Sequence, residues 1–238
     1  MSGRLVLLPT ALGNAGHWSA VLPADTRASA CQLRHFIVEN AKTARASLKW
    51  MEHPVPLREL AIEQLPDPLT AADIERLLAP LGEGHDIGLM SEAGCPGVAD
   101  PGALLVRRAH ERGITVKPLV GPSSLLLALM ASGLDGQRFA FHGYLPQRDP
   151  ERSQRIQALE KESRLKRQTQ LFIETPYRND ALLAALVSTC QPDTLLCLAS
   201  SLTQGDEQVT TRRIGEWRRL AGAGTSKQPT VFLMLSVR

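Results

Sequence analysis

Residues 91–102 read SEAGCPGVADPG, and this stretch of the 238-residue chain decides the fold. It holds three glycines, two prolines and two carboxylates, and it lies between the apolar segments DIGLM (86–90) and ALLVRRAHER (103–112). Glycine lets the backbone approach a neighbour closely, and proline restricts φ. The composition therefore predicts a shaped loop between a strand and a helix, rather than a hinge.

Outward from this loop, short apolar runs alternate with helical segments. The first half predicts strands at 4–8, 35–39, 86–90 and 114–120, and helices at 40–51, 70–81, 103–112 and 123–133. Thr70 and Asp73 have the spacing of a helix N-cap pair. The second half predicts strands at 138–146, 170–174, 194–200, 208–215 and 230–237, helices at 149–166 and 178–190, and a loop at 222–226.

This alternation predicts an α/β protein with two α/β domains, an N-terminal one at residues 1–121 and a C-terminal one at residues 122–238. We expect them to join around residues 121–137. The C-terminal half ends in strands with little helix between them, so its sheet is expected to be mixed.

Composition limits the function classes. The net charge of +3 does not indicate strong non-specific polyanion binding, although arginines gather at 148–167 and 212–219 and could form local basic faces. Four scattered cysteines predict reduced thiols of a cytoplasmic protein rather than a disulfide framework or a zinc site. No apolar run is long enough to cross a bilayer, and the short apolar run after Met1 is expected to be a first strand rather than a signal peptide.

Three turn-rich segments follow strands in the first half: PTALGNAG (9–16), SEAGCPGVADPG and PLVGPSS (118–124). Ligands of α/β sheets bind beyond the carboxyl ends of the strands, so these loops are expected to converge on a ligand. The alternative is that they are ordinary turns. The chain has neither the P-loop pattern GxxxxGK[ST] nor GxGxxG after its first strand, which argues against those two nucleotide sites.

The segments PTALGN (9–14), SEAGCPGVADPG, VGPSS (120–124), FHGYLP (141–146) and FIETPYR (172–178) occur in this order along nearly the whole chain. Together they resemble the tetrapyrrole methylase superfamily. Within it, the set is most similar to the branch of the ribosomal small-subunit RNA 2′-O-ribose methyltransferase I, with its motifs PTPIGN, SDAGTPLISDPG, PGPSA, FxGFLP and ESPHR.

The resemblance implies an S-adenosylmethionine-dependent methyltransferase, usually a homodimer, with the cofactor in a cleft between two α/β domains. It implies no metal. By position, it assigns cofactor contacts in the first half to Leu12, Gly94, Cys95, Val98, Ser123 and Ser124, and in the second half to Ile173, Ala199, Ser200, Pro229 and Thr230.

The chain departs from that branch at residues 39–45, 174–178 and 199–207, which are expected on the substrate side. These changes leave methyl transfer expected and open the question of the acceptor. The leading hypothesis is a ribose hydroxyl of RNA. The alternatives are a small molecule such as a tetrapyrrole, or a non-catalytic SAM-binding regulatory protein of the same fold.

Glu174 is the first candidate for a general base, and Arg178 is a candidate for binding an anionic substrate group. The structural alternatives are that Glu174 is a carboxylate at the N-terminus of the following helix, or that it pairs with Arg178. Asp100 is expected to have a structural role in its turn.

Other polar residues have two interpretations. Glu39 and Asn40 could face the acceptor or cap a helix, and Lys42 and Arg45 could attract an anionic substrate or form a solvated helix face. His142 lies in an apolar strand and is expected to be a core or interface histidine whose hydrogen bonds are satisfied.

Overall fold

The computed structural model describes residues 2–14, 16–220 and 227–236. The chain divides into two compact units, Met1–Ser123 and Ser124–Arg238, each with a five-stranded sheet of its own. Two separate sheets confirm the predicted α/β class. The division into domains at residues 1–121 and 122–238 stays a prediction.

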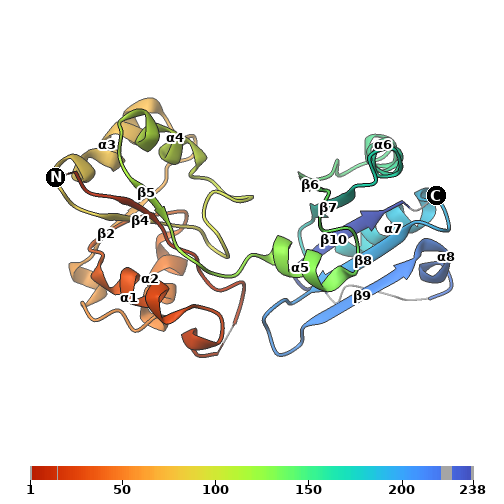
Figure 1. Cartoon of the computed structure of the whole chain (residues 1–238), viewed down its shortest axis with the longest axis horizontal. Coiled ribbons are helices and arrows are strands. Elements are labelled where there is room, and N and C mark those ends of the chain that lie inside the picture. Colours follow the sequence, from red (N-terminus) through yellow and green to blue (C-terminus); the bar gives the residue numbers. More distant parts are fainter. Residues whose placement is uncertain (1, 15, 221–226, 237–238) are drawn as a thin grey trace. The chain divides into compact units, whose positions relative to one another are not determined.

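The first unit is a parallel sheet with helices on both faces (Figure 1). Its strand order is β3-β2-β4-β1-β5, and all four strand pairs are parallel. Its elements are β1 (Leu5–Leu7), η1 (Trp18–Ala20), α1 (Ala24–Gln32), β2 (His35–Val38), α2 (Ala41–Trp50), η2 (Leu57–Glu59), β3 (Ala61–Gln64), α3 (Ala71–Gly82), β4 (Ile87–Met90), α4 (Ala103–Glu111) and β5 (Val116–Pro118).

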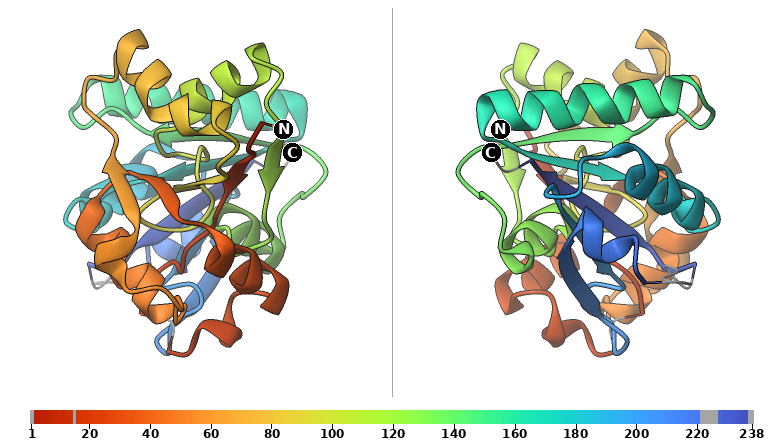
Figure 2. Two further views of the ribbon diagram at one scale, coloured as in Figure 1. Left: turned by 90° about the vertical axis from the view of Figure 1, so that its left-hand side faces the viewer. Right: turned by 90° about the vertical axis from the view of Figure 1, so that its right-hand side faces the viewer.

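Each face of this sheet has its own core. Strand residues such as Phe36 and Val38 pack with α1 and α2, whereas Ile37 and Leu89 pack with α3 and α4. The left-hand view of Figure 2 shows these two helix pairs on opposite sides of the strands. The alternation along β2 follows from the twofold period of a strand, and a sheet buried on both faces explains why its strands read as continuous apolar runs.

Helix ends follow the sequence signals. Thr70 and Asp73 form a capping box at the start of α3, as predicted. The side chain of Asn40 accepts hydrogen bonds from the amides of Lys42 and Thr43, so Asn40 caps α2. Of its two interpretations, the capping role is the one the structure shows.

The second unit has a mixed sheet in the order β6-β7-β10-β8-β9, in which only β6 and β7 pair in parallel. This confirms the predicted mixed sheet. Its elements are α5 (Ser124–Ser132), β6 (Phe139–Tyr144), α6 (Glu151–Lys166), β7 (Thr169–Ile173), α7 (Asn179–Thr189), β8 (Leu195–Ser200), β9 (Gln208–Arg213), α8 (Ile214–Trp217) and β10 (Thr230–Leu235).

Its largest core lies between the sheet and α6, α7 and α8, with Phe172 and Phe232 stacked 6.0 Å apart at their centroids. The long helix α6 lies beside the strands in the right-hand view of Figure 2, and α5 lies on the other side of the sheet in Figure 1.

The structure corrects one strand and adds elements. The strand expected at 208–215 ends at Arg213, because the carboxylate of Glu216 accepts a hydrogen bond from the Arg213 amide and α8 begins at Ile214. The elements α1, β3, η1 and η2 were not predicted. The loop expected at 222–226 lies outside the described residues.

Candidate functional site

The three glycine-rich loops leave the same edge of the first sheet. They follow β1, β4 and β5, and β1 lies between the other two strands. Because these strands are parallel, their carboxyl ends meet at one edge, which is where α/β sheets bind ligands.

The loop after β1 is tied to the loop after β4 by the backbone. The amide of Thr10 donates a 2.9 Å hydrogen bond to the carbonyl of Gly94, and the two residues form an antiparallel bridge. A Cβ placed on Gly94 would lie 3.1 Å from Leu12 Cδ2. Leu12 and Gly94, both expected to contact the cofactor, are therefore neighbours.

The loop after β5 closes against the other two. The thiol of Cys95 lies 3.5 Å from the carbonyl of Pro122, and a Cβ on Gly121 would lie 2.3 Å from Pro9 Cγ. Only glycine at position 121 lets the PLVGPSS segment approach the PTALGN segment so closely. The predicted convergence of the three loops is therefore present in the first unit.

Backbone conformation gives a second reason for glycine in the 91–102 loop. Gly94, Gly97 and Gly102 all have positive φ, at +74°, +78° and +122°. Residues with a Cβ rarely adopt this region. At Gly94 the conformation of the turn itself therefore favours glycine, whether or not a ligand lies close to the backbone.

The loop carries one strongly perturbed carboxyl group. Burial, together with the neighbouring carboxylates of Glu39 and Glu92, raises the pKa of Asp100 to about 6. The backbone amide of Glu92, in the same loop, donates a 3.1 Å hydrogen bond to Glu39 Oε2. Perturbed groups of this kind gather at functional sites, and they also occur in structural clusters.

The other expected first-unit residues have different environments. Val98 is 46% exposed at the tip of the 91–102 loop, and Ser123 and Ser124 are half-buried. Burial raises the pKa of the Cys95 thiol, which argues against a reactive thiolate and fits a packing residue.

The expected second-unit residues gather at one end of the mixed sheet. In the strand register Val231 lies opposite both Ile173 and Ala199, and Thr230 lies opposite Ser200. The hydroxyls of Ser200 and Thr230 are 2.8 Å apart. Pro229 is tied to the same end, because its carbonyl accepts from the Ser201 amide. The sequence motifs thus assemble one group of residues in each unit.

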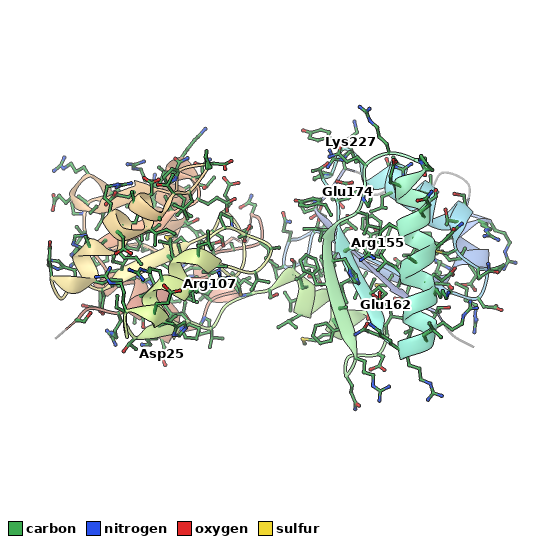
Figure 3. All side chains as sticks on the ribbon, turned by 90° about the horizontal axis from the view of Figure 1, so that it is seen from above. Asp25, Arg107, Arg155, Glu162, Glu174 and Lys227 are labelled. Atoms are coloured by element: carbon green, nitrogen blue, oxygen red, sulfur yellow. The ribbon has the colours of Figure 1, made fainter. Side chains whose placement is uncertain are left out.

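Glu174 and Arg178 form an ion pair just after β7. Glu174 is almost fully buried, and its Oε1 accepts from Arg178 Nη2 at 2.6 Å, from Arg178 Nε at 3.0 Å and from the Thr175 amide. This pairing raises the pKa of Arg178. Figure 3 labels Glu174 in the second unit, together with Arg155 and Glu162 of α6. The ion pair named as a structural alternative for these two residues is therefore present in the structure.

His142 has the satisfied hydrogen bonds expected of it. Its Nδ1 lies 3.1 Å from Arg155 Nη2, and its Nε2 lies 2.6 Å from Gln170 Oε1. Since a guanidinium can only donate, Nδ1 is the acceptor and Nε2 carries the proton.

Two features of the loop edge were not predicted. The Thr10 hydroxyl is fully buried and has no hydrogen-bond partner among the described residues. A pocket of about 280 Å³ lies between α2 and the loops after β1 and β4, with Trp50 in its wall. The helical spacing of Thr43, Ser47 and Trp50 places these side chains on one face of α2, and this spacing is the signal in the sequence that could have indicated the pocket wall.

No group of three or more His, Cys, Asp or Glu side chains among the described residues could hold a metal ion. The four cysteines are unpaired in the structure. Within the same described residues, no helix has the length and apolar character needed to cross a membrane.

A family model described as Tetrapyrrole (Corrin/Porphyrin) Methylases matches residues 21–217. The chain belongs to the tetrapyrrole methylase family. The family resemblance drawn from the loop motifs is thereby confirmed, and the protein is a member of a methyltransferase family. A crystal structure of the methyltransferase CobJ matches 99% of this chain and 95% of its own, with a TM-score of 0.62 at 19% identity, which supports the shared fold.

Curated relatives are proteins named ribosomal RNA small subunit methyltransferase I. That of Escherichia coli O157:H7 is 33% identical over 90% of this chain and 70% of its own length. That of Micromonospora olivasterospora is 32% identical over 90% of this chain and 64% of its own length. The chain thus spans about two thirds of these two relatives, and matches about half of others, such as that of Synechocystis.

Proposed function

We propose that this chain is an S-adenosylmethionine-dependent methyltransferase that methylates a ribose hydroxyl of RNA. The observation that carries the proposal is the convergence of the loops after β1, β4 and β5 at one edge of the parallel sheet. The RNA acceptor is supported by the names of the curated relatives.

The loop edge fits a ligand with both apolar and polar parts. Val98 offers an exposed apolar surface, and the buried Thr10 hydroxyl has an unused hydrogen-bonding capacity among the described residues. We propose that Leu12, Gly94, Cys95, Val98, Ser123 and Ser124 hold the cofactor in the first unit, with Ile173, Ala199, Ser200, Pro229 and Thr230 contributing in the second. That both groups contact one cofactor molecule stays a prediction.

When bound, S-adenosylmethionine supplies an electrophilic methyl group on a sulfonium. The chain then has to hold the acceptor oxygen in line and within about 3–3.5 Å, exclude competing water and receive one proton. Glu174 remains the proposed base and Arg178 a proposed contact for an anionic group. Arg178 and Thr175 donate to Glu174 Oε1, so we propose that the other carboxylate oxygen, Oε2, accepts the proton.

Calorimetry with S-adenosylhomocysteine tests the cofactor. Transfer of a labelled methyl group to rRNA, small ribosomal subunits and a small-molecule extract tests the acceptor. Saturable binding with label in RNA supports the proposal, and label only in the small-molecule fraction points to a small-molecule methylase. Binding without transfer to any acceptor indicates a regulatory protein, and absence of binding at millimolar ligand contradicts the cofactor.

We also infer a homodimer and a cytoplasmic location. In the apolar helix α5, Leu126 and Met130 lie one turn apart and are 53% and 79% exposed. Neighbouring exposed apolar side chains of this kind often mark a protein–protein contact, and we propose that α5 contributes to the dimer interface. The unpaired cysteines are those expected in a reducing compartment.

A further inference from the structure

The pocket of about 280 Å³ lies wholly within the first unit. One wall is a single face of α2, which presents Thr43, Ala46, Ser47 and Trp50 at helical spacing. The opposite wall comes from the loops after β1 and β4 and includes Leu12 and Glu92. The volume is slightly below the range of about 300–1,000 Å³ for sites that hold a drug-sized ligand, so the pocket suits a small group such as one ring system.

Trp50 is held in place in this wall. Its indole is half-buried, packs against the core beneath α1 and α2, and donates through Nε1 to the carbonyl of Gly16. An indole fixed at a pocket wall is a surface on which a flat aromatic ring can stack.

Glu92 supplies a hydrogen-bond acceptor in the same pocket. Its side chain is exposed, and its Oε1 is 3.4 Å from the Thr43 hydroxyl, which also donates 3.1 Å to the carbonyl of Asn40. An ionised carboxylate only accepts hydrogen bonds, so it favours a ligand ring that carries an amino group.

The adjacent face of α2 is basic. Lys42, Arg45 and Lys49 are exposed at helical spacing, and none of them has an ion pair among the residues that the structure describes. Arg45 donates to the carbonyl of Ala41 in its own helix. Cations beside an aromatic pocket are the arrangement that binds a single-stranded nucleic acid: the cations contact the backbone phosphates, and a base enters the pocket.

We propose that this pocket binds one unpaired, amino-bearing nucleobase of the RNA acceptor, stacked on Trp50 and hydrogen-bonded to Glu92, while Lys42, Arg45 and Lys49 contact neighbouring phosphates. The inference rests on the proposed function. Leu12 lines the pocket and also lies against Gly94, so a base held here is beside the loop proposed to hold the methyl donor.

The test measures fluorescence anisotropy of labelled single-stranded ten-nucleotide oligo(A), oligo(C) and oligo(U). Trp50→Ala is expected to weaken oligo(A) and oligo(C) binding at least about fivefold, because a base stacked on an aromatic ring contributes about 1–3 kcal/mol. Trp50→Phe keeps a ring and is expected to stay within about threefold of the unmodified protein. The matched control is Trp18→Ala, a half-buried tryptophan outside the pocket that is expected to change little.

Glu92→Gln separates base recognition from general affinity. It is expected to weaken oligo(A) and oligo(C) more than oligo(U), because uracil has no exocyclic amino group and offers the carboxylate only its ring N3–H. Lys49→Ala is expected to weaken all three oligonucleotides alike and to lower the slope of log affinity against log salt by about 0.7.

The outcomes distinguish this inference from the proposed function. If S-adenosylhomocysteine binds the unmodified protein and Trp50→Ala loses that binding, the pocket belongs to the cofactor and the inference is wrong. It is also wrong if Trp50→Ala leaves oligonucleotide binding unchanged, or if the unmodified protein binds none of them. If Trp50→Ala loses RNA while the unmodified protein binds no S-adenosylhomocysteine, the base pocket stands and the methyltransferase proposal fails.

Discussion

The amide of Thr10 donates to the carbonyl of Gly94 across 2.9 Å, joining two loops that are more than 80 residues apart in the chain. The bond fixes the start of the 91–102 loop to the end of β1. Because this hydrogen bond connects the two loops, we expect a substitution in one loop to affect the conformation of the other.

Gly94→Ala and Gly97→Ala form a matched pair. Both glycines have positive φ, so each alanine is expected to lower the free energy of unfolding by about 1–2 kcal/mol. Only a Cβ at Gly94 meets a neighbour, Leu12 Cδ2 at 3.1 Å; none lies within 4 Å at Gly97. We expect Gly94→Ala to weaken S-adenosylhomocysteine binding several-fold more than Gly97→Ala, as measured by calorimetry on the folded proteins.

Equal loss of stability with unchanged affinity in both variants would mean that the loop is only a turn. Gly94→Val places a branched side chain at the same positive φ and is expected to lose more stability than Gly94→Ala. A loss of binding in Gly94→Val could therefore come from backbone strain alone, so Gly94→Ala is the better test.

Thr10→Val tests the buried hydroxyl. Removing a buried polar atom that has no partner is expected to leave the free energy of unfolding unchanged or to raise it by up to about 1 kcal/mol. If this hydroxyl bonds the cofactor, affinity falls several-fold at the same time. A loss of stability above about 1 kcal/mol, measured by urea unfolding, would show that the hydroxyl has a structural partner.

Asp100→Asn has a defined pH dependence. The folded-state pKa of about 6 lies above the value of about 3.9 for an unfolded aspartate, so the folded protein binds the extra proton between about pH 4 and 6. The stability contribution of Asp100 is therefore present below pH 4 and is lost as the pH rises through 6. Near pH 4 the variant is expected to have the same melting temperature as the unmodified protein. At pH 7–8 its melting temperature is expected to be higher than that of the unmodified protein.

Glu39→Gln provides the check on this assignment. Removing that neighbouring carboxylate is expected to lower the pKa of Asp100 and to move the pH window downward. A melting-temperature difference for Asp100→Asn that stays constant from pH 4 to 8 would contradict the raised pKa.

The sequence predicted most of the fold because strands buried on both sides read as apolar runs between glycine and proline loops. It missed α1 because the buried face of that helix consists of Thr26, Ala30 and Cys31, which give no apolar period. It missed β3 because this edge strand leaves no residue buried.

The site was predicted as far as its loops, since glycine and proline density is a local signal. The contact of Gly121 with Pro9 and the pocket beside Trp50 depend on strand order, which places β1 between β4 and β5. Local composition contains no information on that order. Glu174 shows a different limit: the sequence left open whether it pairs with Arg178 or acts as a base. The structure shows the ion pair, and the catalytic role stays a prediction.

Glu174→Gln and Arg178→Lys separate those roles. In the structure two guanidinium nitrogens, Nε and Nη2 of Arg178, donate to the one oxygen Oε1 of Glu174. Both substitutions weaken this contact, since glutamine removes the negative charge and lysine has a single nitrogen in place of the two donors. Each is expected to lower the free energy of unfolding by about 1–3 kcal/mol, measured by urea unfolding. Only Glu174→Gln also removes the carboxylate that would accept a proton. A base at this position predicts that kcat falls at least about 100-fold in Glu174→Gln, whereas Arg178→Lys keeps the carboxylate and loses much less, with S-adenosylhomocysteine affinity retained in both. If kcat in the two variants instead falls in parallel with their folded fractions, the pair only holds the turn after β7, and the proton of the acceptor is taken by another group.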